Sequence, residues 1–76
     1  MSQRVPPIKP RDLLRVLGRA GFIVHHTSGS HYVLKHPKKP QLRVTVPYHS
    51  KDLKRRTLSS IIHQAGLSTE QFLELL

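Results

Sequence analysis

The sequence predicts one small α+β domain in which a helix is followed by three strands and two further helices. Apolar residues recur at helical spacing in two separate stretches, alternate with polar residues between them, and are divided into segments by glycine and proline. A chain of 76 residues buries only about 60% of its unfolded surface. Any functional site is therefore expected to be shallow or shared with a partner.

Residues 1–9 contain two adjacent prolines and no periodicity, and they are predicted to form a flexible arm before a single domain of residues 10–76. Pro10 suits the first turn of a helix, and apolar residues recur every three or four positions through residues 11–20. The cations of this helix fall on its other side and form a basic stripe: Arg11, Arg15 and Arg19.

Three strands are predicted next, over residues 22–27, 31–35 and 42–46. A turn at residues 28–30 separates the first two, and a loop at residues 38–40 separates the last two. Side chains alternate between the two faces of a strand. The sheet is therefore expected to be antiparallel, with one apolar face covered by helices and one polar face left open.

Two helices complete the predicted domain. The first begins between Ser50 and Arg55, ends at Gly66, and carries a core stripe at helical spacing. That stripe consists of Leu58, Ile61, Ile62 and Ala65. The second is short, and Ser68 with Gln71 has the pattern of a capping box at its start.

Thirteen Lys and Arg residues against four Asp and Glu give the chain a formal charge of +9. Such an excess favours a polyanion, because each phosphate that pairs with a cation releases condensed counterions. An acidic protein partner, or a basic surface that only keeps the chain soluble, would explain the same charge. If the partner is RNA, the predicted contacts are Arg15, Arg19, Lys35, Lys38, Lys39, Arg43, Lys51, Lys54, Arg55 and Arg56.

Several kinds of chemistry are excluded by composition. The chain has no cysteine, four carboxylates in all and no glycine-rich phosphate loop. No apolar run approaches the roughly 18 residues of a membrane span, and the first residues lack a signal-peptide core. We therefore expect a cytoplasmic protein with no cofactor, no small-molecule partner and no contact with a membrane.

His31 is the strongest catalytic candidate among six histidines. It follows the small residues of the turn at 28–30, and it lies on the predicted open face with Lys35 and near Arg43. A histidine beside cations suits phosphodiester cleavage, since imidazole moves a proton while the cations offset charge on phosphate. A ring that only hydrogen-bonds the turn is the alternative.

A zinc site would need His25, His26, His31 and His36 as ligands. The five-residue spacing from His26 to His31 to His36 is expected to turn successive rings to opposite faces of the strands. No metal site is therefore predicted.

Motifs across the chain from Pro10 onward resemble the HicA toxins of bacterial HicAB toxin–antitoxin systems. They are Leu13–Phe22, the Gly29-Ser30-His31 triplet, Val44–His49 and Thr57–Ser68. The resemblance implies a fold like the double-stranded-RNA-binding domain, a small ribonuclease that cleaves mRNA, and catalysis by His31. It also implies a HicB antitoxin that covers this region.

Two functions from different classes follow as hypotheses. One is a metal-independent endoribonuclease in which His31 acts as general acid or base, with Ser30, Lys35 and His49 as candidates for assisting roles. The other is a binding module of the same fold that holds RNA without cutting it, in which His31 has no catalytic role. A third hypothesis is a partner of an acidic antitoxin that has lost its activity.

Overall fold

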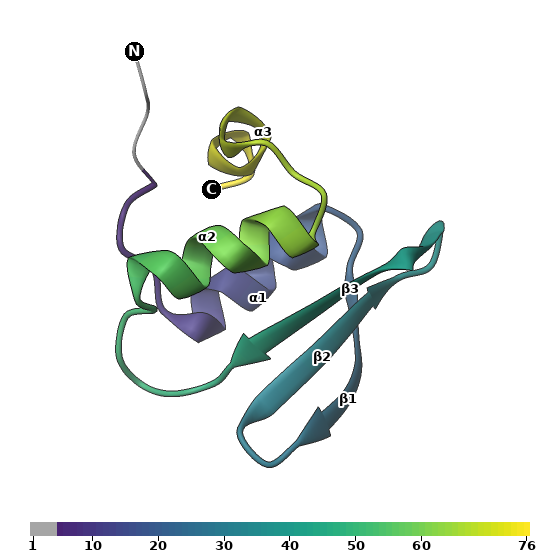
Figure 1. Ribbon diagram of the computed structural model, residues 1–76, viewed down its shortest axis with the longest axis horizontal. Coiled ribbons are helices and arrows are strands. Elements are labelled where there is room, and N and C mark those ends of the chain that lie inside the picture. Colours follow the sequence, from purple (N-terminus) through teal and green to yellow (C-terminus); the bar gives the residue numbers. More distant parts are fainter. Residues whose placement is uncertain (1–4) are drawn as a thin grey trace.

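The structure is a computed structural model that describes residues 5–76. Its elements, in chain order, are α1 (Pro10–Arg19), β1 (Ile23–Ser28), β2 (His31–His36), β3 (Lys39–Pro47), α2 (Arg55–Gln64) and α3 (Thr69–Glu74) (Figure 1). The order and type of these elements confirm the predicted α-β-β-β-α fold class with a short C-terminal helix. None of the helices within residues 5–76 has the length and apolarity needed to cross a membrane.

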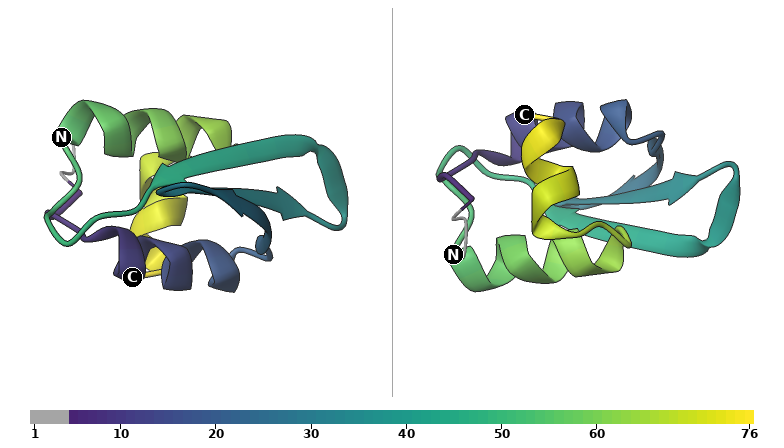
Figure 2. Two further views of the ribbon diagram at one scale, coloured as in Figure 1. Left: turned by 90° about the horizontal axis from the view of Figure 1, so that it is seen from below. Right: turned by 90° about the horizontal axis from the view of Figure 1, so that it is seen from above.

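The three strands form one antiparallel sheet in the order β1-β2-β3. Seen from below, the sheet lies in front of α3, with α1 and α2 along its two sides (Figure 2, left). Seen from above, α3 is in front and lies across the space between α1 and α2 (Figure 2, right). The molecule is therefore layered, with α1 and α2 packed on one face of the sheet and the other face open.

The core lies between the sheet and the helices. Its fully buried side chains come from every layer: Leu13 and Leu17 of α1, Leu34, Val44 and Val46 of the sheet, Ile61 of α2 and Phe72 of α3. All four residues of the predicted stripe on α2 are buried in this cluster. The periodicity of the sequence thus identified the core-facing side of each long helix.

The predicted capping box at the start of α3 is confirmed. The Ser68 hydroxyl accepts a hydrogen bond from the Gln71 backbone N–H at 3.1 Å, and the Gln71 side-chain oxygen accepts one from the Ser68 N–H at 2.9 Å. These bonds satisfy donors that a helix start leaves without partners. They hold a helix of only six residues in place, so that Phe72 can fill the core.

The strand boundaries differ from the predicted ones by one to three residues, and each strand ends one residue later than predicted. The first strand begins one residue later than expected, because Phe22 turns into the core before β1 starts. The expected loop at residues 38–40 shrinks to a turn, since β3 already begins at Lys39. Pro40 fits within β3 because β3 is an edge strand whose register with β2 shifts at this end.

Part of the predicted arm is fixed to the domain. Residues 1–4 lie outside the described part of the chain, and residues 5–9 form no helix or strand. Within them Ile8 is buried in the core, and its carbonyl oxygen accepts a hydrogen bond from the Leu53 N–H at 2.9 Å. The chain is thus anchored to the loop before α2 already at Ile8.

Candidate active site

His31 is the first residue of β2 and lies on a well-defined backbone. Its Cα partners are Ser28 on β1 and Pro47 on β3. The two-residue hairpin loop has Gly29 in its first central position at φ 58°, where a type II′ turn needs a positive φ. The Ser30 carbonyl oxygen accepts a hydrogen bond from the Tyr48 N–H at 2.6 Å. Neighbouring strands therefore hold the His31 backbone from both sides.

The His31 side chain is exposed and has no partner within the described residues. No hydrogen bond between residues 5–76 reaches either nitrogen of its ring. The alternative, in which the His31 ring only forms a hydrogen bond with the turn at residues 28–30, is therefore wrong, since that turn lies within the described residues. Both ring nitrogens of His31 are available to a ligand.

The strand register shows which side chains share the open face with His31. Residues that pair across an antiparallel sheet point to the same face. The open face therefore carries Ile23, His26 and Ser28 of β1, His31, Val33 and Lys35 of β2, and Arg43, Thr45 and Pro47 of β3. Lys35 is directly opposite Arg43, as expected if the second and third strands pair.

The cations expected near His31 are spread along the sheet. A strand rises about 3.3 Å per residue, so the Cα atoms of Lys35 and His31 lie about 13 Å apart. Lys38 and Lys39 are farther still, at the turn between β2 and β3. These cations continue from His31 toward the other end of the sheet, where they can contact a long strand of RNA.

His26 shares the open face with His31, although the five-residue spacing predicts opposite faces. It pairs with Val33, which places it on the open face diagonal to His31, where Cβ atoms are about 7–8 Å apart. Alternation cannot be counted through the turn, because the chain reverses there. Pairing the residues outward from the two-residue hairpin loop places His26 on the face of His31.

His25 lies at a bulge of β1, where it has no partner on β2. Its ring instead contacts the ring of His26. The register shifts between Val24 and His26, and the Nδ1 atoms of His25 and His26 are 2.8 Å apart. The positive charge of Lys35 lowers the pKa of His25, with smaller effects from desolvation, His26 and Arg43. The nearby cation therefore disfavours the charged form of the His25 ring.

His36 is a packing residue rather than a part of the site. Its Nε2 is 3.1 Å from the Ala20 carbonyl oxygen, and its Nδ1 accepts a hydrogen bond from the Lys38 N–H at 3.1 Å. Its ring also meets Phe22 edge-on, with centroids 5.2 Å apart. Within residues 5–76, His, Asp and Glu side chains form no group of three or more that could hold a metal ion.

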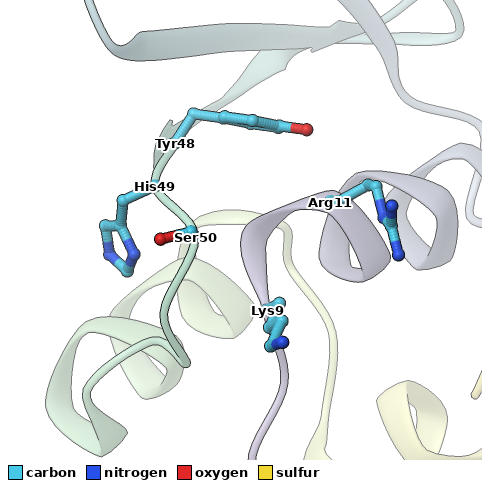
Figure 3. Close-up of a pocket in the computed structure, with 5 residues that line it drawn as sticks. All are labelled: Lys9, Arg11, Tyr48, His49 and Ser50. Atoms are coloured by element: carbon cyan, nitrogen blue, oxygen red, sulfur yellow. The ribbon is translucent and has the colours of Figure 1, made fainter.

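A pocket of about 480 Å³ opens at the end of the sheet that carries His31. It is lined by Lys9, Arg11, Tyr48, His49 and Ser50 (Figure 3). His49, predicted to assist, therefore lies at the same end as His31, and its Nδ1 accepts a hydrogen bond from the Lys51 N–H at 3.2 Å. No local pattern in the sequence predicts this pocket, because it joins residues that are about 40 positions apart.

The remaining predicted RNA contacts are spread around the fold. Arg15 and Arg19 are exposed on α1, on the helix side of the sheet, and an Arg19 guanidinium N–H donates to the Leu75 carbonyl oxygen at 2.6 Å. The others precede or begin α2, and all are exposed: Lys51, Lys54, Arg55 and Arg56. Only Lys35 and Arg43 share the open face with His31.

One comparison with known proteins gives a match. The family model described as the HicA toxin of bacterial toxin-antitoxin systems matches residues 10–67, which run from the first residue of α1 to just beyond α2. None of the curated proteins matches the chain. The matched region includes His31, its neighbour His26 and the aromatic and histidine residues of the pocket.

Proposed function

The chain belongs to the HicA family of toxins from bacterial toxin–antitoxin systems, and on that premise we propose that it is a metal-independent endoribonuclease that cleaves mRNA. The family is known for toxins that cleave RNA. The observation that carries the proposal is the exposed ring of His31, which has no hydrogen-bond partner within residues 5–76 and stands on a backbone held by two neighbouring strands. An exposed imidazole can exchange protons with a ligand, and the held backbone fixes where along the sheet it does so.

The chemistry needs no nucleophile from the protein. RNA carries a 2′-hydroxyl beside each phosphate. His31 takes the proton from that hydroxyl, and the oxygen then attacks the adjacent phosphorus. The bond from phosphorus to the 5′-oxygen of the next nucleotide breaks, which leaves a 2′,3′-cyclic phosphate on one fragment. The departing 5′-oxygen must receive a proton.

His26 is best placed to supply that proton. It is diagonal to His31 on the open face, so a phosphate can lie between the two rings. The Nδ1 atoms of His25 and His26 are 2.8 Å apart, so this contact holds the His26 ring and leaves its Nε2 for the substrate. Lys35 lies on the same face, about 13 Å along the strand from His31 between Cα atoms, where its charge can attract the RNA backbone.

An antitoxin partner follows from the family, and we propose that it is a HicB-type protein that covers His31. The exposed open face offers such a partner the same cations that would contact RNA. An acidic surface on the antitoxin would then compete with RNA for the site. Because the proposed substrate is mRNA, the proposed place of action is the cytoplasm.

Cleavage of a labelled single-stranded RNA in the presence of EDTA tests the proposal. We expect His31→Ala to slow cleavage by at least about 100-fold while folding and RNA affinity are kept. His26→Ala should also slow cleavage, because it removes the proposed proton donor. His63→Ala is the matched control, because it removes an exposed imidazole from α2, outside the proposed site.

Each outcome decides between the two functions. Cleavage that persists in His31→Ala would contradict the catalytic role of this residue. RNA binding without any cleavage by the wild-type protein would favour the binding module. Cleavage that stops when EDTA is added would contradict metal independence.

A further inference from the structure

The pocket beside the sheet end has the size of a ligand site and an aromatic wall. Its volume of about 480 Å³ falls within the range of about 300–1,000 Å³ for small-molecule pockets. In Figure 3 the ring of Tyr48 reaches across the opening toward the first turn of α1, where Arg11 lies, with Ser50 and Lys9 below it. A flat ring could enter between Tyr48 and these residues.

The aromatic wall is held in a fixed position. The Tyr48 ring stacks on that of Tyr32, with centroids 4.7 Å apart and an angle of 25° between the rings. The Tyr48 backbone is tied to Ser30 by the 2.6 Å hydrogen bond described above. A third ring placed on the other face of Tyr48 would continue this stack, and little side-chain freedom would be lost on binding.

The charge of the lining selects the class of ligand. Lys9 and Arg11 are exposed cations, and the five lining residues include no carboxylate. Anionic groups are therefore attracted to the same pocket that offers an aromatic face. A nucleotide combines a flat base with a phosphate, and every base can stack on an aromatic side chain.

The position of the pocket relates it to the cleavage site. Tyr48 directly follows Pro47, the strand partner of His31, so the Cα atoms of Tyr48 and His31 lie within about 10 Å of each other. The pocket itself lies on the helix side of the sheet end, because Tyr48 stacks on Tyr32, whose side chain packs against the core. We propose that it binds a nucleotide close to the scissile bond along the RNA, where the strand passes over the sheet end from the open face, with its base on Tyr48 and its phosphate near Lys9. The identity of the ligand as a unit of RNA rests on the proposed function.

Titration with adenosine 5′-monophosphate (AMP), followed by NMR, tests the site directly. The chain has two tyrosines and no tryptophan, so two sets of tyrosine ring signals report on the stacked pair, and Tyr48→Phe assigns them. We expect a saturable upfield shift of the Tyr48 ring signals. Adenosine should produce the same shift with weaker affinity, because it lacks the phosphate. A wild-type protein whose Tyr48 signals do not shift would overturn the proposal.

Variants then test the two halves of the site, the aromatic ring that would hold the base and the cation that would hold the phosphate. The aromatic half is tested by the affinity for a short single-stranded RNA. We expect Tyr48→Leu to weaken RNA binding by about 5- to 100-fold, whereas Tyr48→Phe should stay within about 2-fold of the wild type. Lys9→Gln should weaken AMP binding more than the charge-matched Lys39→Gln, which changes the distant turn between β2 and β3. Equal losses in the two lysine variants would contradict a phosphate near Lys9.

The outcome of the AMP titration can be distinguished from the outcome of the cleavage test of the proposed function. AMP binding requires no cleavage, and so it can be measured whatever the effect of His31→Ala. If the protein cleaves RNA through His31 but does not bind AMP at Tyr48, the proposed function stands and the proposed nucleotide site is contradicted. A circular dichroism spectrum of Tyr48→Leu shows whether a loss of RNA binding comes from unfolding, and the wild-type titration decides the proposal in that case.

Discussion

The imidazole of His36 occupies the space that a side chain on Gly21 would need. A Cβ atom on Gly21 would be 2.5 Å from the His36 Nε2, and Gly21 has a φ of 100°. The ring cannot easily move away, because one nitrogen contacts the Ala20 carbonyl oxygen, the other accepts from Lys38, and the ring edge packs on Phe22. This contact joins the end of α1 to the end of β2.

We predict that Gly21→Ala destabilises the protein by more than about 2 kcal/mol. A non-glycine residue at positive φ costs about 1–3 kcal/mol, and the clash with His36 adds to that cost. The free energy of unfolding in urea measures the loss. Gly29→Ala is the control, because Gly29 also has a positive φ but has no atom near its Cβ position.

A second variant separates the clash from the backbone strain. His36→Ala removes the ring, so Gly21→Ala should cost less in the His36→Ala background than in the wild type. If Gly21→Ala and Gly29→Ala cost the same, the contact with His36 contributes nothing to the need for glycine at position 21.

Features that depend on neighbours in the sequence could be predicted. The buried stripe of α2 follows from the spacing of apolar residues, and the capping box at Ser68 involves residues only three positions apart. The exposure of His31 follows from the small residues of the turn before it. The beginning of β3 could not be predicted in the same way, because Pro40 is tolerated only as a consequence of the strand order.

The arrangement of the site depends on register and distance, which local patterns do not contain. Alternation correctly predicts that Lys35 and His31 share a face. It does not show that the two residues stand four positions apart along that face. The pocket forms because the chain before α1 is anchored to the loop that follows β3, through the hydrogen bond between Leu53 and Ile8. Contacts between segments this far apart in the chain become visible only in the folded structure.

The low pKa of His25 should rise when its main cause is removed. We expect Lys35→Gln to raise the pKa of His25, whereas the charge-matched Lys38→Gln should have no comparable effect, because Lys38 is not among the groups that shift it. An NMR titration of the imidazole signals measures both. An unchanged pKa in Lys35→Gln would show that Lys35 does not cause the shift.

The same shift predicts how the stability changes with pH. The pKa of His25 is lower in the folded protein than the usual value of about 6.5, so below that pH the unfolded chain binds more protons at this position. The contribution of His25 to stability should therefore be unchanged above about pH 6.5 and should fall as the pH drops toward the folded-state pKa. Lys35→Gln should reduce this loss, which unfolding in urea at several pH values would show.

RNA binding should depend on salt through the cations of the open face. Each phosphate that a single strand pairs with a cation contributes about 0.7 to the slope of log affinity against log salt. Arg43 lies on the open face opposite Lys35, while Arg15 lies on α1 on the helix side of the sheet. In the His31→Ala background, which prevents cleavage, Arg43→Gln should lower the slope by about 0.7 and Arg15→Gln should leave it nearly unchanged.

The two arginine variants remove the same charge, so the comparison isolates position from net charge. Fluorescence anisotropy of a labelled RNA at several salt concentrations between about 50 and 200 mM provides both slopes. Equal reductions in the two variants would mean that RNA also contacts Arg15, in the middle of the basic stripe of α1. A slope that neither variant changes would place the phosphates away from the open face, and with them the strand that His31 is proposed to cleave.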